Sequence, residues 1–151
     1  MDGITHGSTP LGKATTGATE WESFEINGEQ YLAVANEINN AASYNQNSVI
    51  YKWDGSQFIQ TQAIPTSGIR DWHSFKANGE TYLAAANNYS GTSYNTNSFI
   101  YKWNAGTGQF DQLQTIATKA AQDWESFQIA GETYLAVANF GGVSGAQVAN
   151  S

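Results

Sequence analysis

The sequence contains no cysteine, few basic residues and no long hydrophobic run. Without cysteine, the chain cannot form disulfide bridges, thiolate zinc sites or a cysteine nucleophile. No apolar segment approaches the length of about 20 residues that a membrane-spanning helix needs, so we expect no membrane insertion. No basic stretch followed by an apolar run follows Met1–Gly3, so the sequence shows no signal peptide and leaves the compartment open.

Basic residues are the scarcer of the two charged classes. Six Lys and Arg face 13 Asp and Glu, which gives a formal net charge of −7. Nucleic acids and anionic membrane surfaces attract proteins with an excess of basic residues, so both are excluded as expected partners. Aromatic residues make up 13% of the chain and bury much area per side chain, so 151 residues suffice for one domain with an ordinary core.

One segment occurs three times, at residues 21–36, 72–87 and 124–139. Each copy carries Trp, then Ser-Phe, Gly-Glu, Tyr-Leu-Ala and Ala-Asn at the same offsets. The tryptophans that open the copies lie 51 and 52 residues apart. A period near 50 residues is typical of stacked supersecondary units.

Within a repeat, the pattern predicts four antiparallel strands and no helix. Aromatic and alternating segments are separated by turn pairs such as Asn27-Gly28 and Asp54-Gly55, and a polar loop spans residues 39–48. Pro65 is expected to end the fourth strand. Four antiparallel strands in about 50 residues match one blade of a β-propeller. The predicted strands are 21–26, 31–35, 49–53 and 58–64 in the first repeat, with 99–103 and 110–116 as later strands of the second.

We therefore predict an all-β fold in which residues 1–151 form a single repeat domain of about three propeller blades, with repeats starting near residues 21, 72 and 124. Residues 1–20 are expected to supply a strand that completes a neighbouring blade, and the chain is expected to stop just before a third copy of the strand at 49–53. Closed propellers have roughly four to eight blades, and an open arc would expose flat apolar faces. We expect closure by self-association, as a homodimer of about six blades; the alternative is a piece of a longer propeller.

The repeat resembles the epitempin, or epilepsy-associated (EPTP/EAR), repeat over roughly residues 14–151. The resemblance implies a seven-bladed propeller in full-length members such as the leucine-rich glioma-inactivated proteins, with a protein-binding role outside the cell rather than catalysis. This chain differs in having about three repeats and no leucine-rich domain. The motifs that carry the resemblance are Asp123-Trp124-Glu125-Ser126-Phe127, Gly131-Glu132, Tyr134–Asn139 and Asn47–Trp53, followed by Gln62, Ile64 and Thr66 and by Gln114, Ile116 and Thr118.

Acidic residues recur at the first strand of each repeat. In a propeller this strand lines the central channel, where repeated carboxylates can hold a hard cation such as Ca²⁺ through oxygen ligands. The resemblance also implies a channel ion in some relatives. Asp71 and Asp123 are therefore candidate ligands for a channel cation, and no other cofactor is expected. The alternative, which we favour, is that these acids accept backbone N–H bonds.

The sequence gives no reason to expect an enzyme. His73 lacks a fixed acid or nucleophile partner in the pattern, and no Ser-His-Asp order, histidine-pair metal spacing or glycine-rich phosphate loop is present. Glu22 and Glu125 could flank a glycosidic bond, but they occupy equivalent positions of the repeat, so architecture explains them first.

The polar loops are the better functional candidates. Tyr, Asn, Ser and Gly, which fill residues 39–48 and 88–98, are typical of recognition surfaces. We predict a non-catalytic module that binds a protein partner through loops and rim; the alternatives are a lectin-like binder of carbohydrate and a solvated, purely structural loop. The sequence Asn88-Tyr89-Ser90 also fits a glycosylation acceptor. The candidate binding residues are Tyr44, Asn45, Tyr89, Tyr94 and Asn95.

Overall fold

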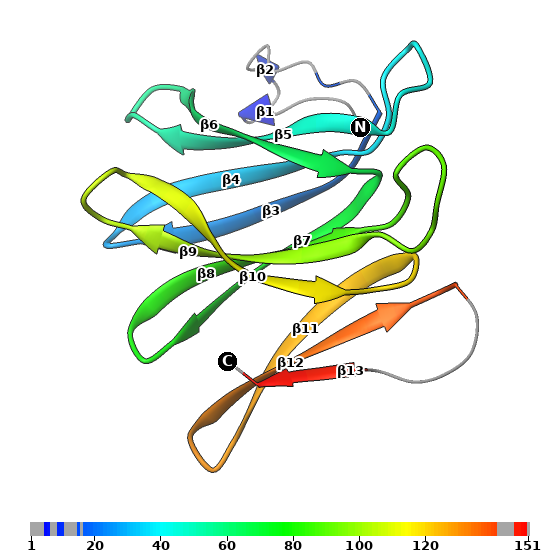
Figure 1. Cartoon of the computed structure of the whole chain (residues 1–151). Coiled ribbons are helices and arrows are strands. Elements are labelled where there is room, and N and C mark those ends of the chain that lie inside the picture. The colour runs from blue at the N-terminus through cyan, green and yellow to red at the C-terminus, as the bar shows by residue number, and fades with distance from the viewer. Residues whose placement is uncertain (1–4, 7–8, 11–14, 16, 142–146, 151) are drawn as a thin grey trace.

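A computed structural model describes residues 5–6, 9–10, 15, 17–141 and 147–150. These residues form antiparallel strands and no helix, which confirms the predicted all-β class (Figure 1). Accordingly, the described part of the chain offers no helix with the length and hydropathy to cross a membrane.

Three sheets correspond to the three repeats, as predicted. The first blade has the strand order β3-β4-β5-β6, the second β7-β8-β9-β10 and the third β11-β12-β13, and their order along the chain is their order in space (Figure 1). The sheets are not closed into a ring. The strands are β3 (Ala18–Ile26), β4 (Glu29–Asn36), β5 (Asn45–Trp53), β6 (Phe58–Ser67), β7 (Ile69–Ala77), β8 (Glu80–Asn87), β9 (Asn97–Asn104), β10 (Gln109–Ala117), β11 (Ala121–Ile129), β12 (Glu132–Asn139) and β13 (Gln147–Asn150).

A two-residue turn joins the first two strands of each blade. Ile26 pairs with Glu29, and the intervening Asn27 and Gly28 have φ angles of 53° and 80°. Positive φ at both central positions matches the twist of the flanking strands, and Asn-Gly adopts it at low cost. The same turn recurs at Asn78-Gly79 and at Ala130-Gly131, where alanine takes the asparagine position with a φ of 52°. The Asn-Gly pairs of the sequence thus predict the turns of the first two blades correctly.

Two strand boundaries differ from the sequence prediction. β5 begins at Asn45 rather than at residue 49, so the preceding loop is shorter than predicted. β6 runs past Pro65 to Ser67, with Pro65 paired to Asn47. A proline is tolerated there because β6 is the outermost strand of its sheet, where one side of the backbone needs no partner.

The third blade also differs from expectation, because its third strand position is filled. Tyr134 pairs with Asn150 of β13 in the same way as Tyr31 pairs with Lys52 of β5. Residues 140–151 contain no third copy of the strand sequence at 49–53, as expected, but Gln147–Asn150 take the position of that strand. The open edge of β12 offers unpaired backbone groups, and a segment without the expected sequence motif satisfies them.

The predicted N-terminal strand falls largely outside the described residues. Within residues 1–20, β1 (Thr5–His6) pairs with β2 (Thr9–Pro10), and β3 begins at Ala18. That residues 1–20 complete a neighbouring blade stays a prediction.

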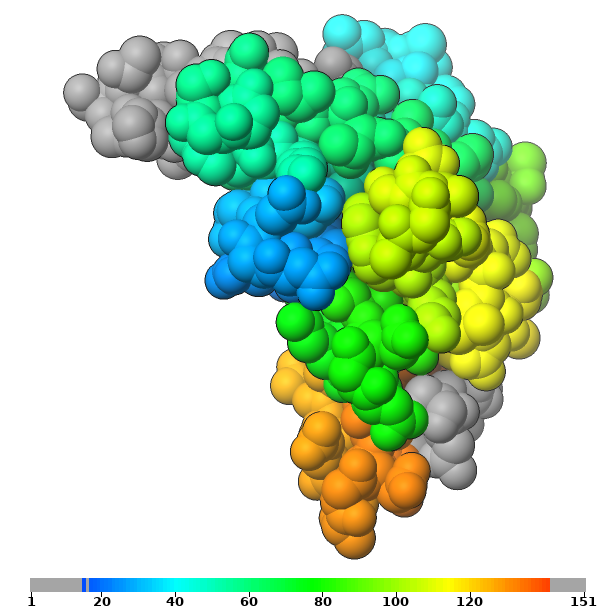
Figure 2. Space-filling view, turned by 90° about the vertical axis from the view of Figure 1, so that its left-hand side faces the viewer, coloured from blue at the N-terminus to red at the C-terminus, as the bar shows by residue number. Residues whose placement is uncertain are grey.

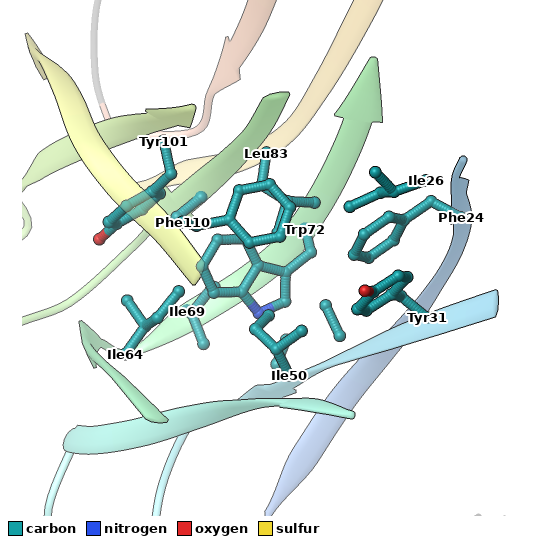
Figure 3. Packing of buried hydrophobic residues seen from close by; sticks show 13 residues of the cluster. Phe24, Ile26, Tyr31, Ile50, Ile64, Ile69, Trp72, Leu83, Tyr101 and Phe110 are labelled. Atoms are coloured by element: carbon teal, nitrogen blue, oxygen red, sulfur yellow. The ribbon is translucent and has the colours of Figure 1, made fainter. Parts of the chain in front are cut away.

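The blades pack face to face through apolar side chains. We call the face that a blade presents to the blade after it in the chain its trailing face, and the face that meets the preceding blade its leading face. One cluster joins the trailing face of blade one to the leading face of blade two (Figure 3), and a second joins blades two and three. The first cluster includes Phe24, Ile26, Tyr31, Ala33 and Ala35 with Trp72, Leu83, Tyr101 and Phe110; the second includes Phe75, Ala84, Ala86 and Ile100 with Trp124, Leu135 and Val137.

Trp72 lies at the centre of the first cluster (Figure 3) and has 0% of its surface exposed. Its indole Nε1–H donates to the Val34 carbonyl of the preceding blade at 3.1 Å, which satisfies the one polar group of the ring. Trp124 occupies the equivalent place in the second cluster. Both tryptophans therefore serve packing between blades rather than forming a row on the surface.

Candidate functional site

The polar loops of the first two repeats meet at one rim of the blades. The β4–β5 loop, residues 37–44, and the β8–β9 loop, residues 88–96, lie on the same side of the molecule. The turns between the first two strands of each blade, which we call the inner hairpins, lie on the opposite side (Figure 1). The Asn45 side-chain amide donates to the Ser90 carbonyl at 3.2 Å, which joins the start of β5 to the second loop. Two segments separated by about one repeat thus form a continuous surface.

Three tyrosines that the sequence singled out form one cluster on this surface. The Tyr44 and Tyr89 rings have centroids 4.8 Å apart in an edge-to-face arrangement, and the Tyr89 and Tyr94 rings are 4.5 Å apart. Tyr94 is 56% exposed, whereas the other two are half-buried. We call these three residues the tyrosine cluster. It presents rigid aromatic area together with phenolic groups, which suits recognition of a partner.

Backbone hydrogen bonds fix the loops to the blade that follows. The Gly68 N–H donates to the Tyr44 carbonyl at 2.7 Å, and the Ala120 N–H donates to the Tyr94 carbonyl at 2.8 Å. Gly68 has a φ of +50°, and a Cβ at this position would lie 2.5 Å from the Tyr89 carbonyl oxygen. Only glycine allows the chain to pass this close, so the second loop is held against the connection between β6 and β7.

Local hydrogen bonds order each loop from within. The Asn39 side-chain oxygen accepts the N–H groups of Ala41 and Ser43, each at 3.0 Å. In the other loop, the Ser90 N–H donates to the Ser93 carbonyl at 3.0 Å. A surface that is already ordered loses less conformational entropy when it binds.

The structure brings four of the five predicted binding residues together. Asn45 is tied to the cluster through Ser90, and its Oδ1 accepts the Ser67 hydroxyl at 3.0 Å. Asn95 follows Tyr94 in the chain, and its N–H donates to the Ser93 hydroxyl oxygen at 3.0 Å. Asn95 is exposed beside the cluster rather than part of its ring contacts.

A groove runs from Asn45 along the outer strands of the first two blades, and the sequence did not reveal it. It encloses about 570 Å³. Its lining contains no charged residue and is rich in side-chain amides beside two aromatic rings, Phe99 and Tyr101. The groove forms because β6 of one blade faces β9 and β10 of the next, a contact that the spacing of the repeats does not specify. Its amide residues are Asn45, Gln46, Asn47, Gln62 and Gln112.

The acids of the inner strands join one blade to the next. Glu20 Oε2 accepts the Trp72 N–H at 3.1 Å, and Asp71 Oδ2 accepts the Trp124 N–H at the same distance. A β-bulge lies directly before each acid, between residues 18 and 20 and between residues 69 and 71. A bulge redirects the following side chain, so the carboxylate can reach the first strand of the next blade. The acids do accept backbone N–H groups, but across blades rather than within a turn.

A second polar contact repeats beside the first. The Ser74 hydroxyl donates to Glu22 Oε1 at 3.1 Å, and His73 Nε2 lies 2.8 Å from the Ser126 hydroxyl oxygen. His73 stands in the repeat where Glu22 stands, so the two pairs are equivalent. The His73–Ser126 pair is therefore the second copy of a blade-to-blade contact, and its geometry does not by itself indicate a catalytic dyad.

Burial shapes the electrostatics of the inner strands. Desolvation raises the pKa of Glu20 to about 8 and the pKa of Asp71 to about 7, with neighbouring acids adding to both shifts. Burial also lowers the pKa of His73. Within the described residues, no group of three or more His, Asp or Glu side chains is arranged to hold a metal ion. Calcium binding by Asp71 and Asp123 stays a prediction; Asp71 is engaged with Trp124, whereas Asp123 is exposed.

The glycosylation triplet is not accessible. Asn88 is 3% exposed, and its side-chain amide donates to the Ala121 carbonyl at 3.1 Å. A glycan needs a free surface asparagine, so Asn88 serves the contact between the second and third blades instead.

Comparisons with known proteins agree with the repeat structure. The family model of the EPTP domain matches residues 14–54, 57–104 and 109–145. The human thrombospondin-type laminin G domain and EAR repeat-containing protein is 42% identical over 130 residues, and the mouse protein of the same name is 40% identical over 134 residues. These matches cover 84% and 87% of this chain but 19% and 20% of the relatives. The chain thus spans about a fifth of their length.

A solved structure shares the arrangement of the blades. The crystal structure of the GH43_1 enzyme from Xanthomonas citri complexed with xylose superposes with a TM-score of 0.56 at 15% identity, over 87% of this chain and 42% of that one. At this identity the likeness shows the fold alone.

Proposed function

Because the chain belongs to the EPTP domain family, we propose that it is a non-catalytic module that binds a protein partner through its rim. The observation that carries the proposal is the tyrosine cluster, which two loops from consecutive blades build together. Tyrosine supplies large contact area at a low cost in conformational entropy and is common at binding hot spots. The relatives are named after their domains and repeats rather than after a reaction.

The polar groups of the inner strands support a non-catalytic role. His73 and Glu22 are each engaged in a contact that recurs from one pair of blades to the next. Glu125 holds the same position in the third repeat and is exposed. A catalytic pair would be expected to break the repeat, since the reaction needs one arrangement and not several copies of it.

The test compares two equally exposed side chains. Tyr94 and Leu113 are 56% and 58% exposed, but Leu113 lies on β10, away from the cluster. The wild-type protein, Tyr94→Ala and Leu113→Ala would be screened by biolayer interferometry against purified cell-surface and extracellular-matrix proteins. We expect Tyr94→Ala to weaken binding of a protein ligand about tenfold, as loss of a hot-spot residue does, and Leu113→Ala to leave it unchanged. Binding that both variants retain would contradict the assignment of the site.

A carbohydrate ligand is the second candidate, and the groove beside the cluster favours it. Amide side chains both donate to and accept from hydroxyl groups, and aromatic rings pack on the apolar faces of sugars. The matched variant is Asn47→Ala, because Asn47 is exposed in the groove and lies outside the tyrosine cluster. Glycan-array signals that Asn47→Ala abolishes and Tyr94→Ala preserves would favour this function over protein binding.

A further inference from the structure

The trailing face of the third blade is exposed where the same face of the other blades is buried. Phe24 and Phe75 are 8% and 6% exposed, but the equivalent Phe127 is 38% exposed. Ile26 is 5% exposed, whereas Ile129 is 56% exposed. Figure 2 shows the turns of the three inner hairpins in a row, with that of the third blade (orange) at the open end.

Apolar side chains are concentrated on this face. Phe127, Ile129 and Phe140 are three of the six large hydrophobic residues that are exposed in the described chain. Phe140 stands in the repeat where Glu37 and Asn88 stand, and both of those contact the next blade, through Arg70 and through the Ala121 carbonyl. A face of this kind is characteristic of a surface that is covered by a partner.

The leading face of the first blade is incompletely covered. Trp72 and Trp124 are fully buried against a preceding blade, but the equivalent Trp21 is only half-buried. The Trp21 indole Nε1 has no hydrogen-bond partner among the described residues, but neither has that of Trp124, which does pack against a preceding blade. The exposure of the Trp21 ring, and not its indole N–H, therefore marks the open face.

The polar groups of the two open faces complement each other. Asp123 stands where Glu20 and Asp71 stand, and those acids accept a tryptophan N–H from the next blade. Glu125 stands where Glu22 and His73 stand, and these bind the serine of the next blade. Asp123 and Glu125 are exposed, as is Ser23, the serine of the first blade.

We propose that the trailing face of the third blade binds the leading face of the first blade in a second copy of this chain. In this contact, Asp123 accepts the Trp21 N–H of the second copy, Glu125 accepts its Ser23 hydroxyl, and Phe127 and Ile129 pack on its Trp21. The interface is a third instance of the contact that the chain makes twice within itself. A second copy is the occupant because its first blade carries the matching leading face.

A head-to-tail contact uses two different surfaces, so it either closes a ring or continues as a chain. Two copies present six blades, a number within the usual range of closed propellers. We therefore expect a closed pair with twice the 16.3 kDa mass of one chain. Light scattering coupled to size-exclusion chromatography measures this mass directly.

Substitution of one exposed residue tests the apolar part of the interface. Ile129→Lys places a charge on the open face without disturbing the core, and we expect it to give a species of 16.3 kDa. Leu113→Lys is the matched control, because Leu113 is similarly exposed but lies outside both open faces, and we expect it to keep the paired mass. Circular dichroism of both variants verifies that the fold is retained.

Cross-linking tests the orientation, and the absence of native cysteine makes it specific. With a short bismaleimide, a mixture of Ser23→Cys and Glu125→Cys chains should give a covalent dimer, whereas either variant alone should not. A dimer from one variant alone would indicate a symmetric contact between identical faces and would overturn the proposal. A wild-type mass of 16.3 kDa at all concentrations, or dissociation by Leu113→Lys as well, would also overturn it.

Discussion

Glu20 and Asp71 occupy the same place in consecutive repeats, and each accepts the N–H of the tryptophan in the next blade. Such a carboxylate must be desolvated to reach its partner, and this is why the pKa of Glu20 rises from 4.5 to about 8 and that of Asp71 from 3.8 to about 7. The hydrogen bond partly offsets the cost of burial but does not abolish it. The contact therefore fixes the position of neighbouring blades at some expense in stability at neutral pH.

This arrangement predicts that stability falls as the pH rises. Between the ordinary and the raised pKa of Glu20, at 4.5 and about 8, the folded chain holds more protons than the unfolded chain at this residue. The free energy of unfolding therefore decreases with rising pH across this window. Glu20→Gln removes the contribution of this carboxyl group to the pH dependence. We therefore expect the free energy of unfolding of the variant, relative to that of wild type, to increase by about 1–2 kcal/mol from pH 5 to pH 8.

Urea unfolding at the two pH values measures this difference. Glu25→Gln is the control, because Glu25 lies on the same strand but is exposed. A Glu20→Gln variant whose stability relative to wild type did not change with pH would show that Glu20 is not buried as described.

At the scale of the strand, Gln62 joins the outer strands of the first two blades. Its Nε2–H donates to the Phe110 carbonyl, and its Oε1 accepts the Phe110 N–H, both at 2.8 Å. The side-chain amide thus pairs with a backbone peptide as a neighbouring strand would. β6 and β10 are held together in this way without being hydrogen-bonded in one sheet.

Replacement of Gln62 by alanine should lower the free energy of unfolding by about 1–2 kcal/mol. Two hydrogen bonds are lost, and the backbone N–H and carbonyl of Phe110 are left without their partner at a partly buried site. Gln114 has the same place in the second repeat but is exposed, so Gln114→Ala should change stability by less than about 0.5 kcal/mol. Chemical denaturation of both variants provides the measurement. Equal effects would mean that Gln62 does not bridge the blades.

The strands could be predicted from the sequence because the residues that determine strands and turns lie close together within each repeat. Alternation, the Asn27-Gly28 turn and the period of the tryptophans specify antiparallel blades without reference to distant residues. β13 could not be predicted, since its pairing with β12 depends on an open edge rather than on its own sequence. Pro65 was misjudged because its effect depends on whether β6 is an outer strand.

The candidate site could be predicted only in part. The composition of the loops identified Tyr44, Tyr89 and Tyr94, but their ring contacts depend on the approach of two blades. The same approach creates the groove and the pairing of His73 with Ser126, neither of which has a local signal. Residues were thus predictable where the repeat fixes them, whereas contacts between repeats required the structure.

At the scale of the whole molecule, the chain is a row of similar blades. Both internal junctions have an apolar cluster, an acid that accepts a tryptophan N–H and a polar contact to a serine. In such an architecture, the free energy of unfolding is approximately the sum of the intrinsic stabilities of the blades and the interaction energies of the junctions between neighbours. The proposed binding rim is a product of the junctions, because the tyrosine cluster takes its members from two blades. The proposed function and the folding of the chain therefore depend on the same packing between blades.

Hydrogen exchange at the backbone N–H groups of Trp72 and Trp124 tests that packing most directly. Each N–H donates to a carboxylate of the preceding blade. We predict that both amides exchange at least about a thousandfold more slowly than in an unstructured peptide, as buried hydrogen-bonded amides do. Exchange of both at the rate of exposed amides, while the amides within each sheet stay protected, would contradict the account.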